Sequence, residues 1–387
     1  MPTILYYCQH LSGVGHYVRS YEIARSLSQS FTVYWVEGGK YVPRPLCKEL
    51  NVIYIPPITR DNGGNIVGLH GDVGIESIFS KRLNILLDFV KNNHIDLLII
   101  EYYPFSKWEL SIELEPLICA VRSNKGLVIC SIRDIIHQTR FENKPNNEYI
   151  KTVIYKLNSN FDAVLVHSDP NFIRLQESFK SIEKIKVPIY YTGIVSEKFN
   201  QSSFISSQQF NLSTFNIPYV VVSAGGSNGG MELITSVIDL WQDHAISQNR
   251  LLVICSMHTR QIKNLLSKKA IYKESKNTIK VLPFREDFLE ILSRCSLSIS
   301  QCGYNTAANI IETGVNAIIH PHQLMSDQHD RSLALERKGL AFYCRDLKLL
   351  GSTIINMNDN SHSKHDLNIN GAETSRSIVE KIIGLNI

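Results

Sequence analysis

The stretch LSISQCGYNTAANIIETGVNAIIHP, residues 297–321, decides the fold class of this chain. A short apolar run ends at Cys302 and Gly303, Asn305 and Thr306 open a helical pattern, and a second apolar run follows in NAIIHP. Continuous apolar strands separated by helices are typical of parallel sheets that are covered on both faces. The stretch therefore predicts a strand–helix–strand unit of an α/β fold.

The same alternation runs through the whole chain. Apolar, β-rich runs occupy residues 3–8, 31–36, 95–100, 126–132, 162–168, 218–226, 251–257, 278–284, 297–303 and 316–321. A stretch rich in Ser, Gln and Asn, residues 197–216, divides them into two series. We therefore expect two doubly wound, Rossmann-like domains over residues 1–196 and 217–371, joined by that linker. A last helix, residues 372–387, is expected to pack back on the first domain.

Composition excludes several classes of protein. The net charge of +4 over 387 residues is too small and too dispersed to indicate a nucleic-acid partner, but it is compatible with diphosphate ligands or peripheral contact with an anionic membrane. The eight cysteines form no C-x-x-C pair and are expected to be free thiols. No leader or membrane-spanning run is apparent, which predicts a cytoplasmic protein.

The turn after the first strand, GVGH, is the first candidate site. Gly13 and Gly15 allow a tight turn, and His16 stands where a helix begins, so its imidazole can reach a substrate. A dinucleotide fingerprint is the alternative, with Glu37 as the ribose-binding acid. However, Val18 holds the place of the third glycine.

Two further segments suit a nucleotide diphosphate. In SAGGSNGG, residues 223–230, Gly225, Gly226 and Ser227 follow a strand and can form a nest of backbone N–H groups for phosphate. The segment lacks the Lys-Ser/Thr ending of an ATP-hydrolysing P-loop. Gly303 with Asn305 and Thr306 offers a second helix start with free N–H groups and a hydroxyl.

The C-terminal half resembles the donor domain of the peptidoglycan lipid-intermediate N-acetylglucosaminyltransferase and the UDP-glycosyltransferases, which share the two-domain fold called GT-B. The residues that carry the resemblance are Gly303, Thr306, Glu312, Gly314, Pro321, Asp327, Gln328 and Gly339. The SAGGS turn matches the family's phosphate loop and the GVGH turn its acceptor-domain loop. The stretch EYYPFSKWELSIELEPL, from Glu101, is similar to a predicted bacterial branch of the family.

This resemblance implies roles for the donor-side residues. Glu312 would bind the ribose hydroxyls, Phe284 and Arg285 would line the base, and Asp327 and Gln328 would hold the donor sugar. Cys302 and Tyr304, on either side of Gly303, depart from the family's pattern and bear on the identity of the donor. The sparser LSGVGH opening, in place of three glycines, argues against the peptidoglycan acceptor.

The expected activity is transfer of a sugar from a nucleotide-sugar, most simply a UDP-sugar, to an acceptor hydroxyl. His16 is the candidate base for an inverting reaction, because an imidazole is well matched to accepting the proton. Asp134 would contact the acceptor or orient the base, and capping a helix is its alternative role. Helix starts would replace a metal ion, and no cofactor is expected.

Two other functions stay open from the sequence: a nucleotide-sugar epimerase of the same fold and a non-catalytic nucleotide-sugar-binding protein. The acceptor could be a saccharide, a lipid or a small molecule. Its specificity is expected to lie in the glycine-rich loop of residues 60–74.

Overall fold

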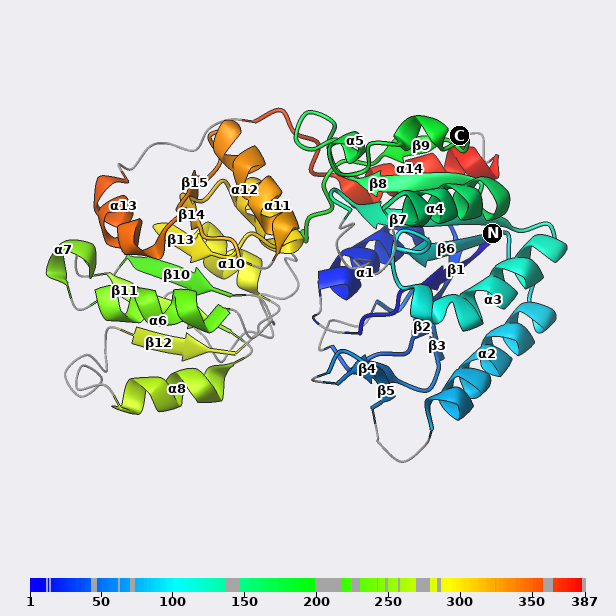
Figure 1. The fold of residues 1–387 in the computed structure, drawn as a ribbon, viewed down its shortest axis with the longest axis horizontal. Helices are drawn as coiled ribbons and strands as arrows, with labels where there is room; N and C mark the ends of the chain where they lie inside the picture. The colour runs from blue at the N-terminus through cyan, green and yellow to red at the C-terminus, as the bar shows by residue number, and fades with distance from the viewer. Residues whose placement is uncertain are drawn as a thin grey trace. The chain divides into compact units, whose positions relative to one another are not determined.

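The protein folds as two compact units, Met1–Ser196 together with Leu367–Ile387, and Glu197–Asp366. The computed structural model describes residues 1–11, 13, 15–42, 47–61, 63–69, 74–136, 146–198, 218–224, 230–241, 243–247, 250–256, 258–268, 279–283, 287–323, 325–357 and 365–384. Each unit is an α/β layer structure in its own right (Figure 1).

The first unit is built on a parallel sheet of seven strands in the order β3-β2-β1-β6-β7-β8-β9. The strands are β1 (Thr3–Tyr7), β2 (Thr32–Glu37), β3 (Leu50–Tyr54), β6 (Leu97–Glu101), β7 (Leu127–Arg133), β8 (Ala163–His167) and β9 (Ile189–Tyr191). The chain fills one side of β1 with β2 and β3 and then crosses to β6 on its other side. This reversal between β1 and β6 is the place where doubly wound sheets bind ligands.

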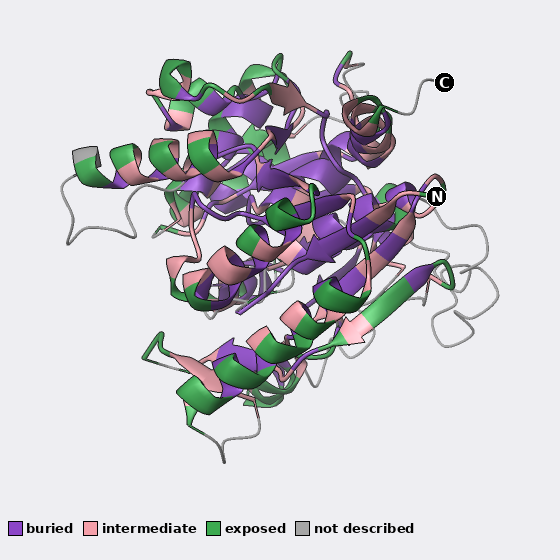
Figure 2. Ribbon diagram, turned by 90° about the vertical axis from the view of Figure 1, so that its right-hand side faces the viewer, coloured by how far each residue is buried: buried purple, intermediate pink, exposed green. Residues whose placement is uncertain are grey.

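Helices cover both faces of this sheet, as the alternation of its buried side chains requires. Leu5 and Tyr7 of β1 face a core with α2 (Ile75–Asn92), α3 (Ser111–Ser123) and α4 (Asn146–Asn160). Ile4 and Tyr6 face the other core, with α1 (Gly15–Leu27) and α14 (Gly371–Ile383). Figure 2 shows the inner strands buried, an edge strand partly exposed, and the outer sides of the helices exposed. Smaller elements are α5 (Leu175–Ser178) and the antiparallel pair β4 (Ile58–Arg60) and β5 (Ile66–Gly68).

The second unit has a parallel sheet of six strands in the order β12-β11-β10-β13-β14-β15. The strands are β10 (Tyr219–Ser223), β11 (Leu251–Cys255), β12 (Ile279–Leu282), β13 (Leu297–Ser300), β14 (Ala317–Ile319) and β15 (Phe342–Tyr343). The helices are α6 (Met231–Leu240), α7 (His244–Ser247), α8 (Thr259–Lys268), α10 (Phe288–Ser293), α11 (Tyr304–Thr313), α12 (Ser326–Arg337) and α13 (Leu350–Asn356). Its order reverses between β10 and β13, so a second ligand-binding edge lies there.

The C-terminal segment joins the first unit before its helix begins. The backbone N–H of Ile194 donates to the carbonyl of Asn368 at 2.8 Å, and Val195 forms an antiparallel bridge with Asn370. The structure therefore places the boundary at Leu367, earlier than residue 372, which the polar sequence had suggested. From there α14 lies against α1, and Ser30 donates a hydrogen bond to Glu380 at 2.6 Å.

Among the described helices, none combines the length and the apolar character that crossing a membrane would require.

Candidate active site

His16 stands just beyond the exit of β1, an inner strand of the first sheet. After β1 the chain turns through Gly13, whose φ of 68° is left-handed, and enters α1 at Gly15. No atom lies within 4 Å of a side chain added at Gly13, so its backbone conformation rather than crowding favours glycine there. His16 thus lies in the first helical turn, at the carboxyl edge of the sheet, as the GVGH pattern predicted.

Glu101 provides the carboxylate that binds His16. It ends β6, the strand paired with β1 across the reversal point of the sheet. Its Oε1 lies 2.6 Å from His16 Nδ1, although the two residues are 85 positions apart in the chain. Glu101 is buried, and the His16 side chain keeps 26% of its surface exposed. This carboxylate–imidazole pair fixes the orientation of the ring.

Two cations share the same carboxylate. Arg19, one turn further along α1, donates to Glu101 Oε1 at 2.6 Å, and Lys107 donates to Oε2. Burial alone would raise the pKa of Glu101, but His16, Lys107 and Arg19 together hold it well below its ordinary value. Burial lowers the pKa of His16 to about 4, against the opposing effect of Glu101. At neutral pH the site therefore holds an ionised Glu101 and a neutral imidazole.

The second ring nitrogen of His16 is available for chemistry. Nδ1 is engaged by Glu101, while Nε2 makes no hydrogen bond to any residue in the described part of the chain. The Tyr102 ring packs edge-on against the imidazole, with 5.3 Å between ring centroids. A ring that is held on one side, neutral, and partly exposed on the other can accept a proton from a bound hydroxyl group.

The sequence had offered Asp134 as the group that orients the base, and the structure places Glu101 in that position instead. Asp134 follows β7, is 2% exposed, and accepts a hydrogen bond from the N–H of Ile135 at 2.9 Å. It does not cap a helix, because the next two residues, Ile135 and Ile136, are not helical. A contact between Asp134 and the acceptor stays a prediction.

On the second sheet, the predicted diphosphate site is the start of α11. Gly303 precedes the helix with φ −66° and ψ 160°, and its carbonyl accepts from the N–H of Ala307 at 2.9 Å. Asn305 and Thr306 lie in the first turn and are half-buried. Tyr304 is buried, with the guanidinium of Arg331 6.0 Å from its ring centroid. The first turn thus keeps accessible polar groups, and Tyr304 packs inward.

Arg331 of α12 connects this helix to the residues that precede α11. This residue of α12 is fully buried, donates to the carbonyl of Cys302 at 2.8 Å and pairs with Asp327 at 3.3 Å. Asp327 is therefore held by Arg331 in this structure, and Gln328 accepts from the N–H of His322 at 2.9 Å. The starts of α11 and α12 lie side by side, because β13 and β14 are neighbouring strands. Binding of the sugar by Asp327 and Gln328 stays a prediction.

Glu312, the predicted ribose ligand, lies near the end of α11. Its Oε2 is 3.2 Å from Lys198 Nζ, and its side chain is 11% exposed. A sugar hydroxyl that bonded to Glu312 would share the carboxylate with Lys198 or displace it. Five other predicted donor-side residues lie outside the described part of the chain: Gly225, Gly226, Ser227, Phe284 and Arg285.

Residues 220–383 match the model of the glycosyltransferase family 28 C-terminal domain. This part of the chain, less than half of its length, is similar to that domain. The match runs through the second unit and on into α14, which packs in the first unit. The predicted glycosyltransferase domain is therefore confirmed.

A curated relative of the family 28 domain supports the same assignment. The chain is 22% identical over 226 residues to the UDP-N-acetylglucosamine–N-acetylmuramyl-(pentapeptide) pyrophosphoryl-undecaprenol N-acetylglucosamine transferase of Leuconostoc mesenteroides. The match covers 58% of this chain and 57% of the relative, so the chain spans little more than half the length of that protein.

Solved structures extend the likeness from the family 28 domain to the whole chain. A UDP-glucosyltransferase from Polygonum tinctorium has a TM-score of 0.60 at 12% identity, covering 99% of this chain and 93% of the other. MurG of Acinetobacter baumannii has a TM-score of 0.55 at 15% identity, covering 98% and 100%. The predicted GT-B fold, with two Rossmann-like halves, is therefore confirmed.

Glu101 is the functional candidate that sequence reasoning missed. Its signal was a carboxylate directly after the buried run IDLLII, at the carboxyl end of a parallel strand. Ligand-binding side chains concentrate at such strand ends. The sequence did not show that this strand pairs with β1, which brings Glu101 to His16.

Proposed function

We propose that the whole chain transfers a sugar from a UDP-sugar to an acceptor hydroxyl, with inversion and without a metal ion. The observation that carries the proposal is the pair His16–Glu101, joined at 2.6 Å and placed at the ligand-binding edge of the first sheet. The family 28 domain and the GT-B fold supply the context in which such a pair acts as a base.

His16 is the general base in this proposal. Its Nε2 takes the proton of the acceptor hydroxyl while the acceptor oxygen bonds to the anomeric carbon and the nucleoside diphosphate leaves. Glu101 holds Nδ1, so the free electron pair of the ring lies on Nε2. A single displacement of the diphosphate by the acceptor inverts the anomeric centre.

The second unit holds the donor. The N–H groups in the first turn of α11, with the side chains of Asn305 and Thr306, receive the diphosphate, and the helix dipole adds a positive field. Glu312 receives the ribose hydroxyls. UDP is the proposed nucleotide because a structurally similar transferase from Siraitia grosvenorii, with a TM-score of 0.57, was solved in complex with UDP. A helix start stabilises the leaving diphosphate without a metal.

The acceptor binds the first unit, near His16. The name of the Leuconostoc relative gives an acceptor linked to undecaprenol, a lipid, and the Polygonum tinctorium enzyme is described as glucosylating indoxyl, a small molecule. We propose that the acceptor is an alcohol of one of these classes, and that the chain works at or near the inner face of a membrane if the acceptor is a lipid.

Incubation with radiolabelled UDP-sugars, with and without EDTA, tests the proposal. The wild type should release UDP by slow hydrolysis or transfer, and His16→Gln should lose about 10²–10⁴-fold in rate while still binding UDP. His94→Gln is the matched control, because His94 also pairs with a carboxylate, Asp96 at 3.3 Å, but is exposed at the opposite end of β6. An isomerised sugar, or binding without turnover, would contradict the proposal.

A further inference from the structure

Glu101, the carboxylate beside His16, is surrounded by more positive charge than a simple acid–base pair requires. Glu101 contributes one negative charge, and its two cationic partners, Arg19 and Lys107, contribute one positive charge each. With the imidazole neutral, the group of four side chains thus has a formal charge of +1. Adding a proton to His16 would raise this charge to +2.

This balance changes what Glu101 can do. In a carboxylate–imidazole pair, the carboxylate orients the ring and also stabilises the imidazolium that forms. Here two cations already neutralise the carboxylate, so mainly the orienting effect is left. We propose that Lys107 is a positioning residue whose ammonium offsets the charge of Glu101. Glu101 then aligns the His16 ring through Nδ1 without stabilising the doubly protonated imidazolium form. Its bearing on catalysis rests on the proposed role of His16 as the base.

Lys107 is held at this position from two sides. Its Nζ donates to Glu101 and also to the carbonyl of Gln9 at 2.8 Å, where the chain leaves β1. The side chain of Gln9 is fixed in turn by the buried Arg82, whose Nη2 donates to Gln9 Oε1 at 2.8 Å. The ammonium therefore bridges the exits of the two central strands.

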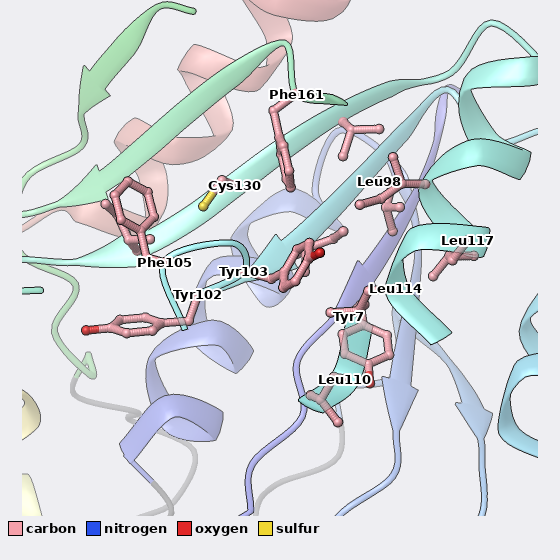
Figure 3. Packing of buried hydrophobic residues seen from close by; sticks show 14 of the residues in the cluster. Tyr7, Leu98, Tyr102, Tyr103, Phe105, Leu110, Leu114, Leu117, Cys130 and Phe161 are labelled. Atoms are coloured by element: carbon pink, nitrogen blue, oxygen red, sulfur yellow. The ribbon is translucent and has the colours of Figure 1, made fainter. Parts of the chain in front are cut away.

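The backbone around Lys107 supports the same conclusion. Tyr102 and Lys107 have φ values of 71° and 62°, in the left-handed region that residues with a side chain seldom adopt. Between them, the N–H of Ser106 donates to the carbonyl of Tyr102 at 2.9 Å. Tyr103 and Phe105 anchor the segment in the same buried core as Tyr7 and Leu110 (Figure 3). The left-handed conformations of Tyr102 and Lys107, at the two ends of this turn, bring the Lys107 side chain back to Glu101, which lies just before the turn in the chain.

The remaining groups that face His16 do not alter the balance of charge. The Cys8 thiol donates to the His16 carbonyl at 3.7 Å, and the ring of Tyr102 packs against the imidazole. Arg133 lies 5.5 Å from the centroid of that tyrosine ring. Among the described residues in contact with His16, Glu101 is the only carboxylate. Burial is the largest cause of the lowered pKa of His16, and Lys107 and Arg19 act in the same direction.

Titration of His16 by NMR in the full chain tests the proposal directly. The His16 signal is assigned by its absence in His16→Gln. We expect Lys107→Met to raise the pKa of His16 by about one unit or more, and Lys107→Arg, which keeps the charge, to leave it low. Lys125→Met is the matched control: Lys125 is also a left-handed lysine, with φ 65°, but it is exposed at the end of α3.

In Lys107→Met, the acid limb of the pH–rate profile should shift to higher pH together with the pKa of His16. If methionine is not tolerated, Lys107→Gln removes the same charge but keeps hydrogen-bond donors for Glu101 and Gln9. An unchanged His16 pKa in a folded neutral variant, or a rise of equal size in Lys107→Arg, would overturn the proposal. A raised pKa in a chain that transfers no sugar under any condition would support the charge coupling and reject the proposed function.

Discussion

Glu101→Gln exchanges one carboxylate oxygen for an amide nitrogen at the centre of the site. The amide oxygen can still accept hydrogen bonds from His16 and Arg19. The new NH2 group, however, would face the ammonium of Lys107, and it cannot accept a hydrogen bond from it. The variant therefore removes the negative charge that Arg19 and Lys107 both contact, and the side chains of these two cations are 1% and 11% exposed. Removing one partner of such a buried ionic group costs about 3–5 kcal/mol of the free energy of unfolding.

The same substitution should reduce transfer by roughly 10²–10⁴-fold, because the His16 ring loses the acceptor that fixes its tautomer. Urea unfolding and the initial rate of UDP release measure the two effects on one preparation. His16→Gln separates them: it should lose comparable activity but only about 1.5–3 kcal/mol of stability, since it removes one hydrogen bond to a charged group and no charge. Near-normal turnover in a folded Glu101→Gln protein would refute the assignment of the pair.

Three further outcomes are expected. Glu312→Ala should weaken UDP binding by about 1.5–3 kcal/mol in calorimetry, with or without EDTA, because it removes hydrogen bonds to a charged group; unchanged affinity would exclude the ribose assignment. The pKa of His16 is about 4 in the folded chain, below its ordinary value of about 6.5, so on acidification the unfolded chain takes up the proton first. The free energy of unfolding, measured with urea, should therefore fall as the pH drops below about 6.5, and it should fall less in His16→Gln. Arg82→Met should lower the free energy of unfolding by about 3–5 kcal/mol, because it removes the cation paired with the buried Glu113 carboxylate, which then keeps the hydrogen bond from the Tyr7 hydroxyl. A second change, Glu113→Leu, should restore part of the loss; equal stability of the single and double variants would show that the ion pair is not what matters.

Much of the fold was predictable because its strands are long apolar runs that local sequence identifies. The ten runs expected from the sequence correspond to β1, β2, β6, β7, β8 and β10 to β14. Within the two large sheets, the strands that were missed, β3, β9 and β15, lie at the edges. β3 is mostly exposed, and β9 and β15 have only three and two residues, so none of the three carries a distinct apolar pattern.

The loop expected over residues 60–74 shows a different limit of local sequence. Its glycines indicated irregular chain, yet Ile66–Gly68 pairs with Ile58–Arg60 in an antiparallel hairpin. Gly68 lies against Ile78 of α2, where an added side chain would approach to 2.4 Å. Packing against that helix, which the sequence does not reveal, is what gives this segment its order.

The sequence by itself determined the α/β class, the division into two halves, the GVGH turn with His16, and the helix start at Gly303, because these depend on periodicity and on the conformational preferences of single residues. Only the tertiary structure decided which carboxylate meets His16. Glu101 reaches the imidazole, and Lys107 reaches Glu101, because the chain crosses from β3 to the far side of β1 and lays β6 beside it. Strand pairing of this kind is set by the packing of whole layers, so no local pattern records that two residues 85 positions apart will share a hydrogen bond.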